Sequence, residues 1–388
     1  MTGARPDRGY LDAGGHAPLH PAAREALAAA WAEGWADPRR LHTEGRRARL
    51  LLDGARESIA ASIGARPQEV VFASSLTQAL HHGVLGVATG RRRVGGRIVV
   101  SAVERAAVLH ASRTAAGHSP GGAVDVIPVD TRGRVDVAAL VAATTAPGCA
   151  LTALQHANGE VGTLQPVAAA HDAARSAGVP LLVDAGASLG PVEVGDAWDL
   201  LAANAGDWGG PGDLAVLAVR PRVRWGPAWP EDDAENGWFP GGVGVPAALA
   251  AAVSLAAVLH ERTETEARRR ALVDLARRRI AAEVPDVELV GDPEARLPHV
   301  LTFSCLYVDG EAVVGELDRL GFAVGSGSAC TSSTLEPSHV LAAMGVLTHG
   351  NVRLALPPDV SRATVERFCD VLPDAVARVR DVLGVDGL

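Results

Sequence analysis

Short runs of consecutive apolar residues alternate along this chain with longer segments whose apolar positions recur every three to four residues. The short runs predict buried β-strands, and the longer segments predict amphipathic helices. The predicted helices cover 21–33, 43–63, 77–87, a segment from about 104, 135–144, 166–177, 246–280, 311–320 and a segment from about 362. The predicted strands cover 70–72, 97–100, 124–128, 150–154, 179–183, 200–203, 214–219, 287–289, 300–304 and 352–354.

The order of these elements predicts an α/β fold. Strands that alternate with helices of this length favour a mostly parallel sheet covered by helices on both faces. The strands are continuous apolar runs rather than alternating ones, which is typical of strands buried on both faces. We therefore expect helices on both sides of a central parallel sheet.

The pattern changes after a surface-type segment, 222–244, that is rich in Pro, Gly, Trp and acidic residues. The long helix that follows leads into a mixed α+β pattern. We predict a large α/β domain over 1–255 and a smaller α+β domain over 256–388, with the boundary inside the long helix. An N-terminal arm, 1–20, is expected to pack on the small domain.

Composition narrows the classes of function. The chain has 388 residues, a net charge of −9 and a pI near 5.8, which argues against general nucleic-acid binding. Its four cysteines form no CxxC pair, and no histidine cluster has metal-ligand spacing, so we expect no metal site and a reducing cytoplasm. The N-terminus lacks an apolar signal core, and the longest apolar run, 245–259, contains Pro246 and is short for a membrane span.

The most unusual segment is 321–345, GFAVGSGSACTSSTLEPSHVLAAMG, which places a single thiol, Cys330, in a run of Gly, Ser and Thr. Such small residues do not pack a core, so the segment reads as a loop that can carry the thiol toward a substrate. A connector in which Cys330 is incidental is the alternative. The segment resembles the active-site loop of cysteine desulfurases, which use pyridoxal phosphate (PLP) to move sulfur from cysteine onto a loop thiol.

Further landmarks in the same order resemble the class V aminotransferase-like family of PLP fold type I, over residues 10–383. They are Tyr-Leu-Asp near the start, LHTEGRRAR (41–49), EVVFASSLTQA (69–79), VSAVE (100–104), AxxxVGTLQP (157–166), VDAGAS (183–188), WGGPGDLAVLAVR (208–220) and NVRLAL (351–356). The resemblance is nearest to the cysteine desulfurases. It implies a PLP-transferase fold, a homodimer that completes each site across the two-fold axis, and a persulfide formed on Cys330.

The resemblance also assigns roles to individual residues. Asp184 matches the partner of the cofactor's pyridine nitrogen, Thr77 a phosphate-binding position, and Arg353 the arginine that binds the substrate carboxylate. Asn158, a retained polar residue beside the position of the cofactor-hydroxyl ligand, is also assigned to cofactor binding. The alternatives are a helix cap for Asp184 and for Thr77, and a surface salt bridge for Arg353.

The cofactor's covalent anchor is missing. The sequence contains no lysine, so all 36 basic residues are arginine. Arginine does not form a Schiff base. Where the family's lysine precedes Gly-Gly-Pro, this chain has Asp207, and Gly206 replaces the preceding histidine.

Other positions of the family pattern differ as well. Arg105 stands at the ring-stacking histidine, Gly159 at the hydroxyl-binding asparagine, Ala187 at a glutamine, and Gly242 at the phosphate-binding threonine that comes from the partner subunit. Together these changes indicate that the demand for the cofactor is relaxed. The resemblance therefore implies PLP that is at best non-covalently bound.

Two hypotheses of different classes follow. The first is a sulfur-transfer protein in which Cys330 accepts or passes a persulfide, with cysteine or another sulfur donor as substrate and a sulfur-acceptor protein as partner. The second is a non-catalytic paralogue that dimerises with or regulates a true desulfurase or a sulfur-transfer partner. A third, more distant reading is a C–S or C–N lyase that uses PLP without a lysine anchor. The sequence leaves enzyme activity open.

Overall fold

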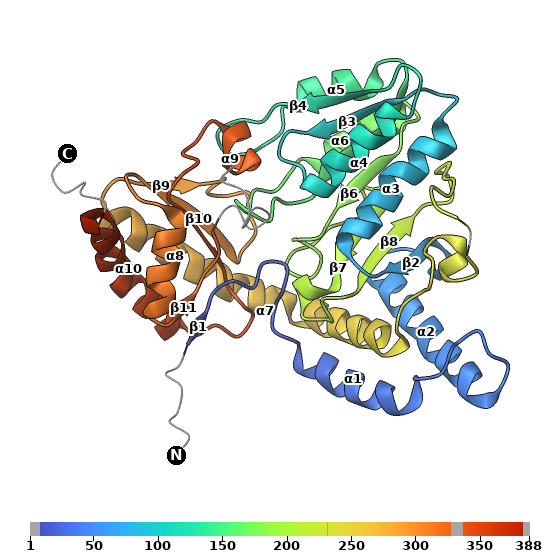
Figure 1. The fold of residues 1–388 in the computed structure, drawn as a ribbon, viewed down its shortest axis with the longest axis horizontal. Helices are drawn as coiled ribbons and strands as arrows, with labels where there is room; N and C mark the ends of the chain where they lie inside the picture. The colour runs from blue at the N-terminus through green and yellow to red at the C-terminus, as the bar shows by residue number, and fades with distance from the viewer. Residues whose placement is uncertain (1–7, 231, 327–336, 383–388) are drawn as a thin grey trace.

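The computed structural model describes residues 8–230, 232–326 and 337–382. Its centre is a seven-stranded sheet with the order β2-β8-β7-β6-β5-β3-β4 (Figure 1). The strands are β2 (Val70–Ala73), β3 (Arg97–Ser101), β4 (Ala123–Ile127), β5 (Cys149–Gln155), β6 (Leu181–Asp184), β7 (Leu200–Asn204) and β8 (Ala215–Val219). Adjacent strands from β4 to β7 run parallel, and β8 is antiparallel to both β7 and β2. The predicted mostly parallel α/β sheet is confirmed.

Helices cover both faces of this sheet, as the continuous apolar strands predicted. They are α2 (Thr43–Ser62), α3 (Leu76–Arg91), α4 (Ala106–Gly117), α5 (Val137–Thr145) and α6 (Val167–Ser176). Successive residues of a strand point to opposite faces, so Val70 and Phe72 join one buried cluster while Val71 and Ala73 join the other. Side chains from α2, α5 and α6 line the first cluster, and α3 and α4 line the second.

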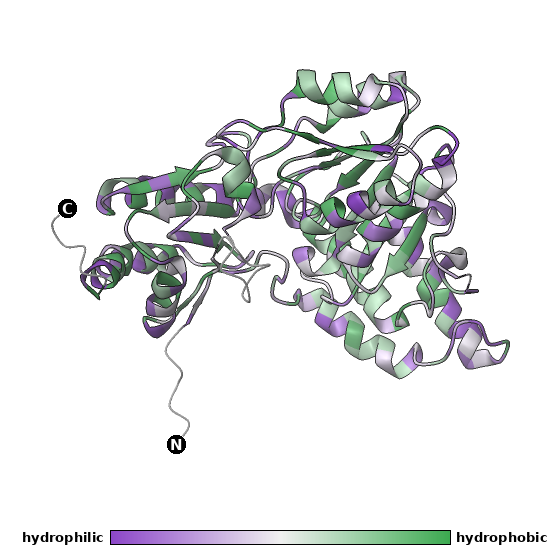
Figure 2. Ribbon diagram, turned by 45° about the horizontal axis from the view of Figure 1, so that its top comes forward, coloured by the Kyte–Doolittle hydropathy of each residue, from purple (hydrophilic) through white to green (hydrophobic). Residues whose placement is uncertain are grey.

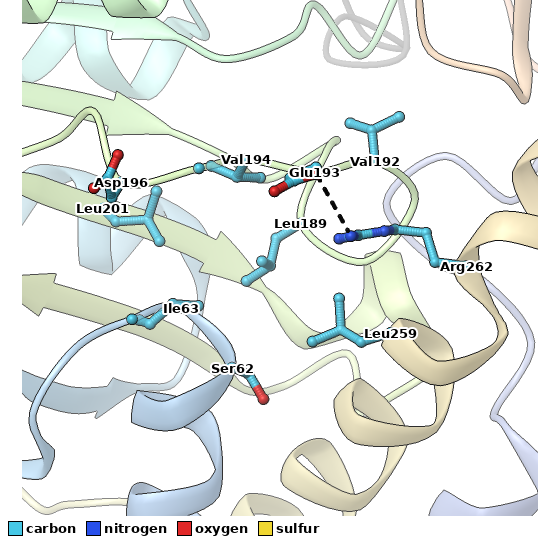
Figure 3. Close-up of a pocket in the computed structure, with 12 residues that line it drawn as sticks. Ser62, Ile63, Leu189, Val192, Glu193, Val194, Asp196, Leu201, Leu259 and Arg262 are labelled. Carbon is cyan, nitrogen blue, oxygen red and sulfur yellow. Dashed lines mark ion pairs between the residues drawn. The ribbon is translucent and has the colours of Figure 1, made fainter.

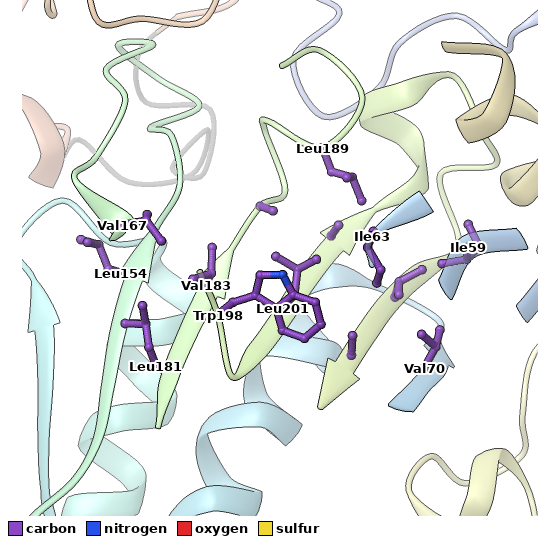
Figure 4. Close-up of a cluster of buried hydrophobic side chains, with 14 of the residues drawn as sticks. Ile59, Ile63, Val70, Leu154, Val167, Leu181, Val183, Leu189, Trp198 and Leu201 are labelled. Carbon is purple, nitrogen blue, oxygen red and sulfur yellow. The ribbon is translucent and has the colours of Figure 1, made fainter. Parts of the chain in front are cut away.

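The first cluster is built around Trp198, which is 1% exposed. Figure 4 shows its ring among Leu181, Val183 and Leu201. The hydropathy colouring places apolar residues along the central strands and polar residues on the outer helix surfaces (Figure 2). The sheet is thus held from both sides, which makes its carboxyl edge a rigid support for loops.

The longest helix, α7 (Val245–Glu283), extends from beneath the large sheet to the small domain (Figure 1). Ala248, Ala251 and Leu255 of its first half belong to the large-domain core, whereas Val273 and Ile280 belong to the small-domain core. Among the described residues, α7 alone is long and apolar enough to cross a membrane. That is weak evidence for a span, because its alanine-rich half packs against α2 and against α1 (Pro21–Glu33) in the protein core.

The small domain contains a three-stranded antiparallel sheet of β9 (Val287–Val290), β10 (Val300–Cys305) and β12 (Asn351–Ala355), in the order β12-β10-β9. Three helices accompany it: α8 (Gly310–Arg319), α9 (His339–Met344) and α10 (Arg362–Val382). The N-terminal strand β1 (Gly9–Tyr10) pairs in parallel with β11 (Phe322–Ala323). The division of the chain at residue 255 stays a proposal, since α7 contributes to both cores.

The boundaries of two helices near the site differ slightly from prediction. Helix α3 begins at Leu76, one residue early, because Ser75 caps it by accepting a hydrogen bond from the Gln78 amide. Helix α4 begins at Ala106, two residues later than predicted. Arg105 has non-helical backbone angles (φ −55°, ψ 139°), so Glu104 and Arg105 remain in the turn after β3.

Candidate active site

The predicted site residues of the large domain gather at one edge of the sheet. The parallel strands β3, β5, β6 and β7 end there. Asp184 is the last residue of β6, and the segments that follow β3, β5 and β7 carry Arg105, Asn158 and Asp207. In α/β folds, ligands bind outside the carboxyl ends of the strands. The sequence order therefore places these four residues where a cofactor site is expected.

Asp184, the last residue of β6, is paired with Arg105. Nε of Arg105 lies 2.8 Å from Oδ2 of Asp184, and the Gly186 amide donates a hydrogen bond of 2.8 Å to Oδ1. The Asp184 side chain is 3% exposed, and that of Arg105 is 37% exposed. A buried carboxylate without a partner is costly, so this ion pair satisfies a strong electrostatic demand. The sequence analysis placed each residue separately and did not predict the pair.

The side chain of Leu76 also lies close to the Gly186 backbone, beside Asp184 and Arg105. A Cβ atom added to Gly186 would lie 2.3 Å from Cδ2 of Leu76, 2.8 Å from Oδ1 of Asp184 and 2.9 Å from Nη2 of Arg105. Three side chains from α3, β6 and the start of α4 thus converge on the Gly186 backbone. The space beside the Asp184 carboxylate is occupied by the protein's own atoms.

Asp207 lies in the short 3-10 helix η2 (Ala205–Trp208) that follows β7. Its Oδ1 accepts a hydrogen bond of 2.9 Å from the Gly15 amide, and its Oδ2 accepts one of 3.1 Å from Nδ2 of Asn204. Asn204 also donates to the Gly15 carbonyl at 3.0 Å. Burial raises the pKa of Asp207 to about 6, helped by the charge of Asp184 and opposed by that of Arg105. The aspartate at the lysine position therefore binds the N-terminal arm.

The side chain of Asn158 makes hydrogen bonds with backbone groups around it. Its Oδ1 accepts hydrogen bonds from the amides of Glu160 and Val161, both at 2.9 Å, and its Nδ2 donates to the Val103 carbonyl at 3.2 Å. With 3% exposure, Asn158 has the environment of a turn-forming residue. Its assignment to cofactor binding stays a prediction.

Gly159, which the resemblance assigns to the cofactor hydroxyl, lies beside Ala187, which stands at a glutamine of the family pattern. A Cβ atom added to Gly159 would lie 3.3 Å from the Cβ atom of Ala187. Neither residue carries a polar side-chain atom. Both substitutions thus remove hydrogen-bonding capacity from one place.

Thr77 lies near the start of α3 and is exposed. It lines a pocket of about 350 Å³ together with Ser75, Gln78, His81, His82, Trp229 and Pro240. Asp184, Asp207 and Arg353 are not among these lining residues. The structure places Thr77 at a helix N-terminus, where anions are favoured, and its phosphate-binding role stays a prediction.

Arg353, on β12, pairs with the N-terminal arm. Its Nη2 lies 2.9 Å from Oδ1 of Asp12, while its Nε is buried and has no hydrogen-bond partner among the residues that the structure describes. The Arg353 side chain is 11% exposed, so its ion pair with Asp12 is not a surface salt bridge. Arg353 and Gly325 exchange backbone hydrogen bonds of 2.7 and 3.0 Å, which places Arg353 beside the segment that leads to the thiol loop.

Two glutamates were not assigned a role from the sequence: Glu104, which is buried, and Glu160, which is partly buried. Burial raises the pKa of Glu104 to about 8, and Oε2 of this residue has no hydrogen-bond partner. Burial raises the pKa of Glu160 to about 7, opposed by Ser338 and by the charge of Arg353. Neither residue has a sequence signal of its own, since burial is decided by the packing of distant segments.

Cys330 lies outside the described residues. The other three cysteines are all buried. Burial raises the pKa of Cys149, and it raises the pKa values of Cys305 and Cys369 to about 11. Since the thiolate is the reactive form, these three thiols are poor nucleophiles. No group of three or more metal-ligating side chains occurs among the described residues.

A second pocket, of about 450 Å³, lies away from this edge, between α2, α7 and the segment after β6. Figure 3 shows apolar side chains, including Leu189, Leu201 and Leu259, around it. Arg262 and Glu193 face each other at its border, with 3.8 Å between Nη2 and Oε2. None of the predicted site residues lines this pocket.

The residues of the site do not fit PLP as the family holds it. The cofactor needs an amine for its aldehyde, an acid for its pyridine nitrogen and a polar contact for its hydroxyl. Here Asp207 replaces the amine, Arg105 already pairs with Asp184, and Gly159 and Ala187 offer no polar side-chain atom. We therefore derive no reaction step through this cofactor.

Comparisons with known proteins agree with the fold and with the order of the sequence landmarks. Residues 9–223 and 241–368 match the family Aminotransferase class-V. The chain is 35% identical over 382 residues to an IscS-like cysteine desulfurase of Mycobacterium tuberculosis, covering 96% of this chain and 97% of that protein. It is 31% identical over 379 residues to the cysteine desulfurase IscS of Dictyoglomus turgidum, covering 96% and 95%.

Solved structures support the same fold. A NifS-like protein superimposes with a TM-score of 0.87 at 23% identity, covering 96% of this chain and 100% of the other. The apo structure of the cysteine desulfurase from Thermococcus onnurineus NA1 gives a TM-score of 0.84 at 22% identity, covering 96% and 95%. The chain belongs to the class V aminotransferase family, among its cysteine desulfurase-like members, and it has the fold of the PLP-dependent transferases of fold type I.

Proposed function

We propose that this protein takes part in sulfur transfer, with Cys330 as the thiol that accepts and passes on a persulfide. The observation that carries the proposal is the similarity over 96% of the chain to proteins named cysteine desulfurases. The thiol-loop sequence GSACTS lies within residues 241–368, which match the family Aminotransferase class-V. Arg353, beside the segment that leads into the loop, supports the same function, because its planar guanidinium suits a carboxylate-bearing donor.

The chemistry of the site favours a donor that already carries sulfane sulfur over free cysteine. Breaking the C–S bond of cysteine needs the cofactor as an electron sink, and the residues of the site do not fit it. Transfer from a persulfide needs only a thiolate. The Cys330 thiolate attacks the outer sulfur of the donor, the donor's S–S bond breaks as a new one forms, and the donor leaves as a thiolate.

Mass spectrometry tests this function. The purified protein is incubated with a small-molecule persulfide, and the thiols are alkylated and mapped by peptide. We expect a mass gain of one sulfur atom on the peptide that contains Cys330 and its absence from the Cys330→Ser variant. Cys149, Cys305 and Cys369 serve as internal controls, because all three are buried. No sulfur on Cys330 from any persulfide donor overturns the proposal.

The second candidate is a non-catalytic paralogue that binds or regulates a true desulfurase or a sulfur-transfer partner. The Arg105–Asp184 ion pair and the aspartate at position 207 favour it, because both conflict with cofactor chemistry. Alanine released from cysteine by the pure protein would eliminate this candidate. Co-purification with a desulfurase from the native host would support it.

Homodimerisation is part of the proposal. The family builds each site from two subunits, and this chain exposes large apolar side chains near α1 and α2. Trp31 and Trp35 are 64% and 65% exposed, and Leu41 and Leu50 are 86% and 73% exposed. A second copy covering these side chains would remove them from water. We further propose a cytoplasmic location, without a nucleic-acid or membrane partner, and a sulfur-acceptor protein downstream. Any PLP that binds is proposed to do so without a covalent anchor.

A further inference from the structure

We infer that Arg105 takes the electrostatic place of the cofactor ring, so that Asp184, Arg105 and Asp207 form a site that is complete without PLP. This inference goes beyond sulfur transfer, because it concerns how the fold manages without its cofactor. It does not depend on Cys330.

The first support is charge balance at Asp184. The carboxylate is 3% exposed and therefore needs a cation or several hydrogen bonds. In the PLP-bound family that cation is the protonated pyridine nitrogen. Here Nε of Arg105 at 2.8 Å supplies it, and the Gly186 amide satisfies the other oxygen at 2.8 Å. Both carboxylate oxygens are engaged by the chain itself.

The second support is the use of space. Leu76, Asp184 and Arg105 all approach the Gly186 backbone so closely that even a methyl group there would collide with them. A flat ring placed against Asp184 would first have to displace the Arg105 guanidinium. The Arg105–Asp184 ion pair and Leu76 thus fill the space beside the Asp184 carboxylate, and Arg105 also neutralises its charge.

The third support is the altered task of Asp207. The charges of Arg105 and Asp184 both act on the Asp207 carboxyl, since Arg105 lowers the pKa of Asp207 and Asp184 raises it. The two carboxylate oxygens of Asp207 accept hydrogen bonds from the Gly15 amide and the Asn204 side chain. The neighbouring Gly206 carbonyl accepts a hydrogen bond of 2.8 Å from the Ala17 amide. The position that anchors the cofactor in the family anchors the N-terminal arm here.

Thermal unfolding of four proteins tests the inference. They are the wild type, Arg105→Ala, the double variant Arg105→Ala/Asp184→Asn, and Arg113→Ala as the matched control. Arg113 is an exposed arginine on the same helix, α4. Each protein is melted alone, with PLP and with inorganic phosphate. Phosphate is needed as a control because Arg105 is 37% exposed and anions can reach it.

We expect PLP to raise the melting temperature of the wild type no more than phosphate does. Arg105→Ala should melt at least about 3 °C below Arg113→Ala, because it leaves Asp184 buried and unpaired. Adding Asp184→Asn should recover most of that loss, since it removes the unpaired charge. The double variant also serves if Arg105→Ala fails to fold.

Either of two results overturns the inference. One is a wild type that PLP stabilises clearly more than phosphate does. The other is an Arg105→Ala variant that melts together with Arg113→Ala. Because no thiol is involved, the outcome is independent of the persulfide experiment on Cys330.

Discussion

The backbone amide of Gly15 donates a hydrogen bond of 2.9 Å to Oδ1 of Asp207, although the two residues lie 192 positions apart in the sequence. The contact joins the N-terminal arm to the point at which related proteins hold their cofactor. The same arm binds Arg353 through Asp12 and pairs with β11 through β1. One segment therefore connects the cofactor edge of the large sheet to the small domain.

This contact predicts a pH-dependent stability. Burial raises the pKa of Asp207 from 3.8 to about 6 in the folded protein. A raised folded-state pKa gives a stabilisation that is present below about pH 4 and is lost as the pH rises through about 6. We expect Asp207→Asn to gain stability relative to the wild type over that range, by at most about 3 kcal/mol.

Urea unfolding of both proteins at about pH 5 and about pH 7 measures this difference. The control is Asp213→Asn, which changes an exposed aspartate in the neighbouring loop. A free-energy difference between Asp207→Asn and the wild type that does not vary with pH would contradict the prediction.

Glu104 predicts a second pH effect, at higher pH. Burial raises the pKa of Glu104 from 4.5 to about 8, so the side chain is mostly protonated at neutral pH. The stabilisation associated with the proton is lost as the pH rises through about 8. The advantage of Glu104→Gln over the wild type in unfolding free energy should therefore grow by more than about 1 kcal/mol between about pH 5 and about pH 9. Chemical unfolding at both pH values checks this, with the exposed Glu57→Gln as control.

The crowding at Gly186 predicts that the effects of two substitutions on stability are not additive. Gly186→Ala brings a methyl group to 2.3 Å from Cδ2 of Leu76, and overpacking of this kind costs about 2 kcal/mol. Leu76→Ala alone should cost about 2–5 kcal/mol, because Leu76 is buried. The double variant should lose less than the sum of the two single losses, because the smaller side chain makes room for the methyl group. The measurement is a double-mutant cycle by urea unfolding.

Gly54→Ala is the matched control for that cycle. Gly54 lies within α2, and a Cβ atom there meets no atom within 4 Å. Alanine favours a helix over glycine by up to about 1 kcal/mol, so this variant should be at least as stable as the wild type. Strictly additive effects of Gly186→Ala and Leu76→Ala would show that the two residues do not share the site.

The exposed tryptophans predict the self-association surface. Replacing Trp31 and Trp35 by glutamate places charge on side chains that are 64% and 65% exposed in the single chain. Because these side chains lie in the proposed dimer interface, we expect the dissociation constant of the dimer to increase at least about tenfold. Sedimentation velocity across a concentration series measures it. Val126→Glu, on the outer strand β4, alters a side chain that is 51% exposed and should leave association unchanged.

Most of the fold follows from the one-dimensional pattern. The runs around Val99, Leu151 and Val183 are mostly apolar because parallel strands are covered on both faces, so their location and order were predictable. The helix periods likewise gave α1 with its full bounds and α2 to within a residue. The small differences at α3 and α4 arise from the Ser75 cap and from the extended turn at Arg105.

The sequence by itself determined the family, the sheet and the lack of any lysine, and it predicted Asp207 at the position of the family's lysine, because these depend on residue identity and local order. Only the tertiary structure decided that Arg105 pairs with Asp184, that Asp207 accepts a hydrogen bond from Gly15, and that Glu104 is buried and Glu160 partly buried. Those relationships join segments far apart in the chain. Whether a charge is paired or buried depends on which strand ends the fold brings together, and a linear pattern does not contain that information.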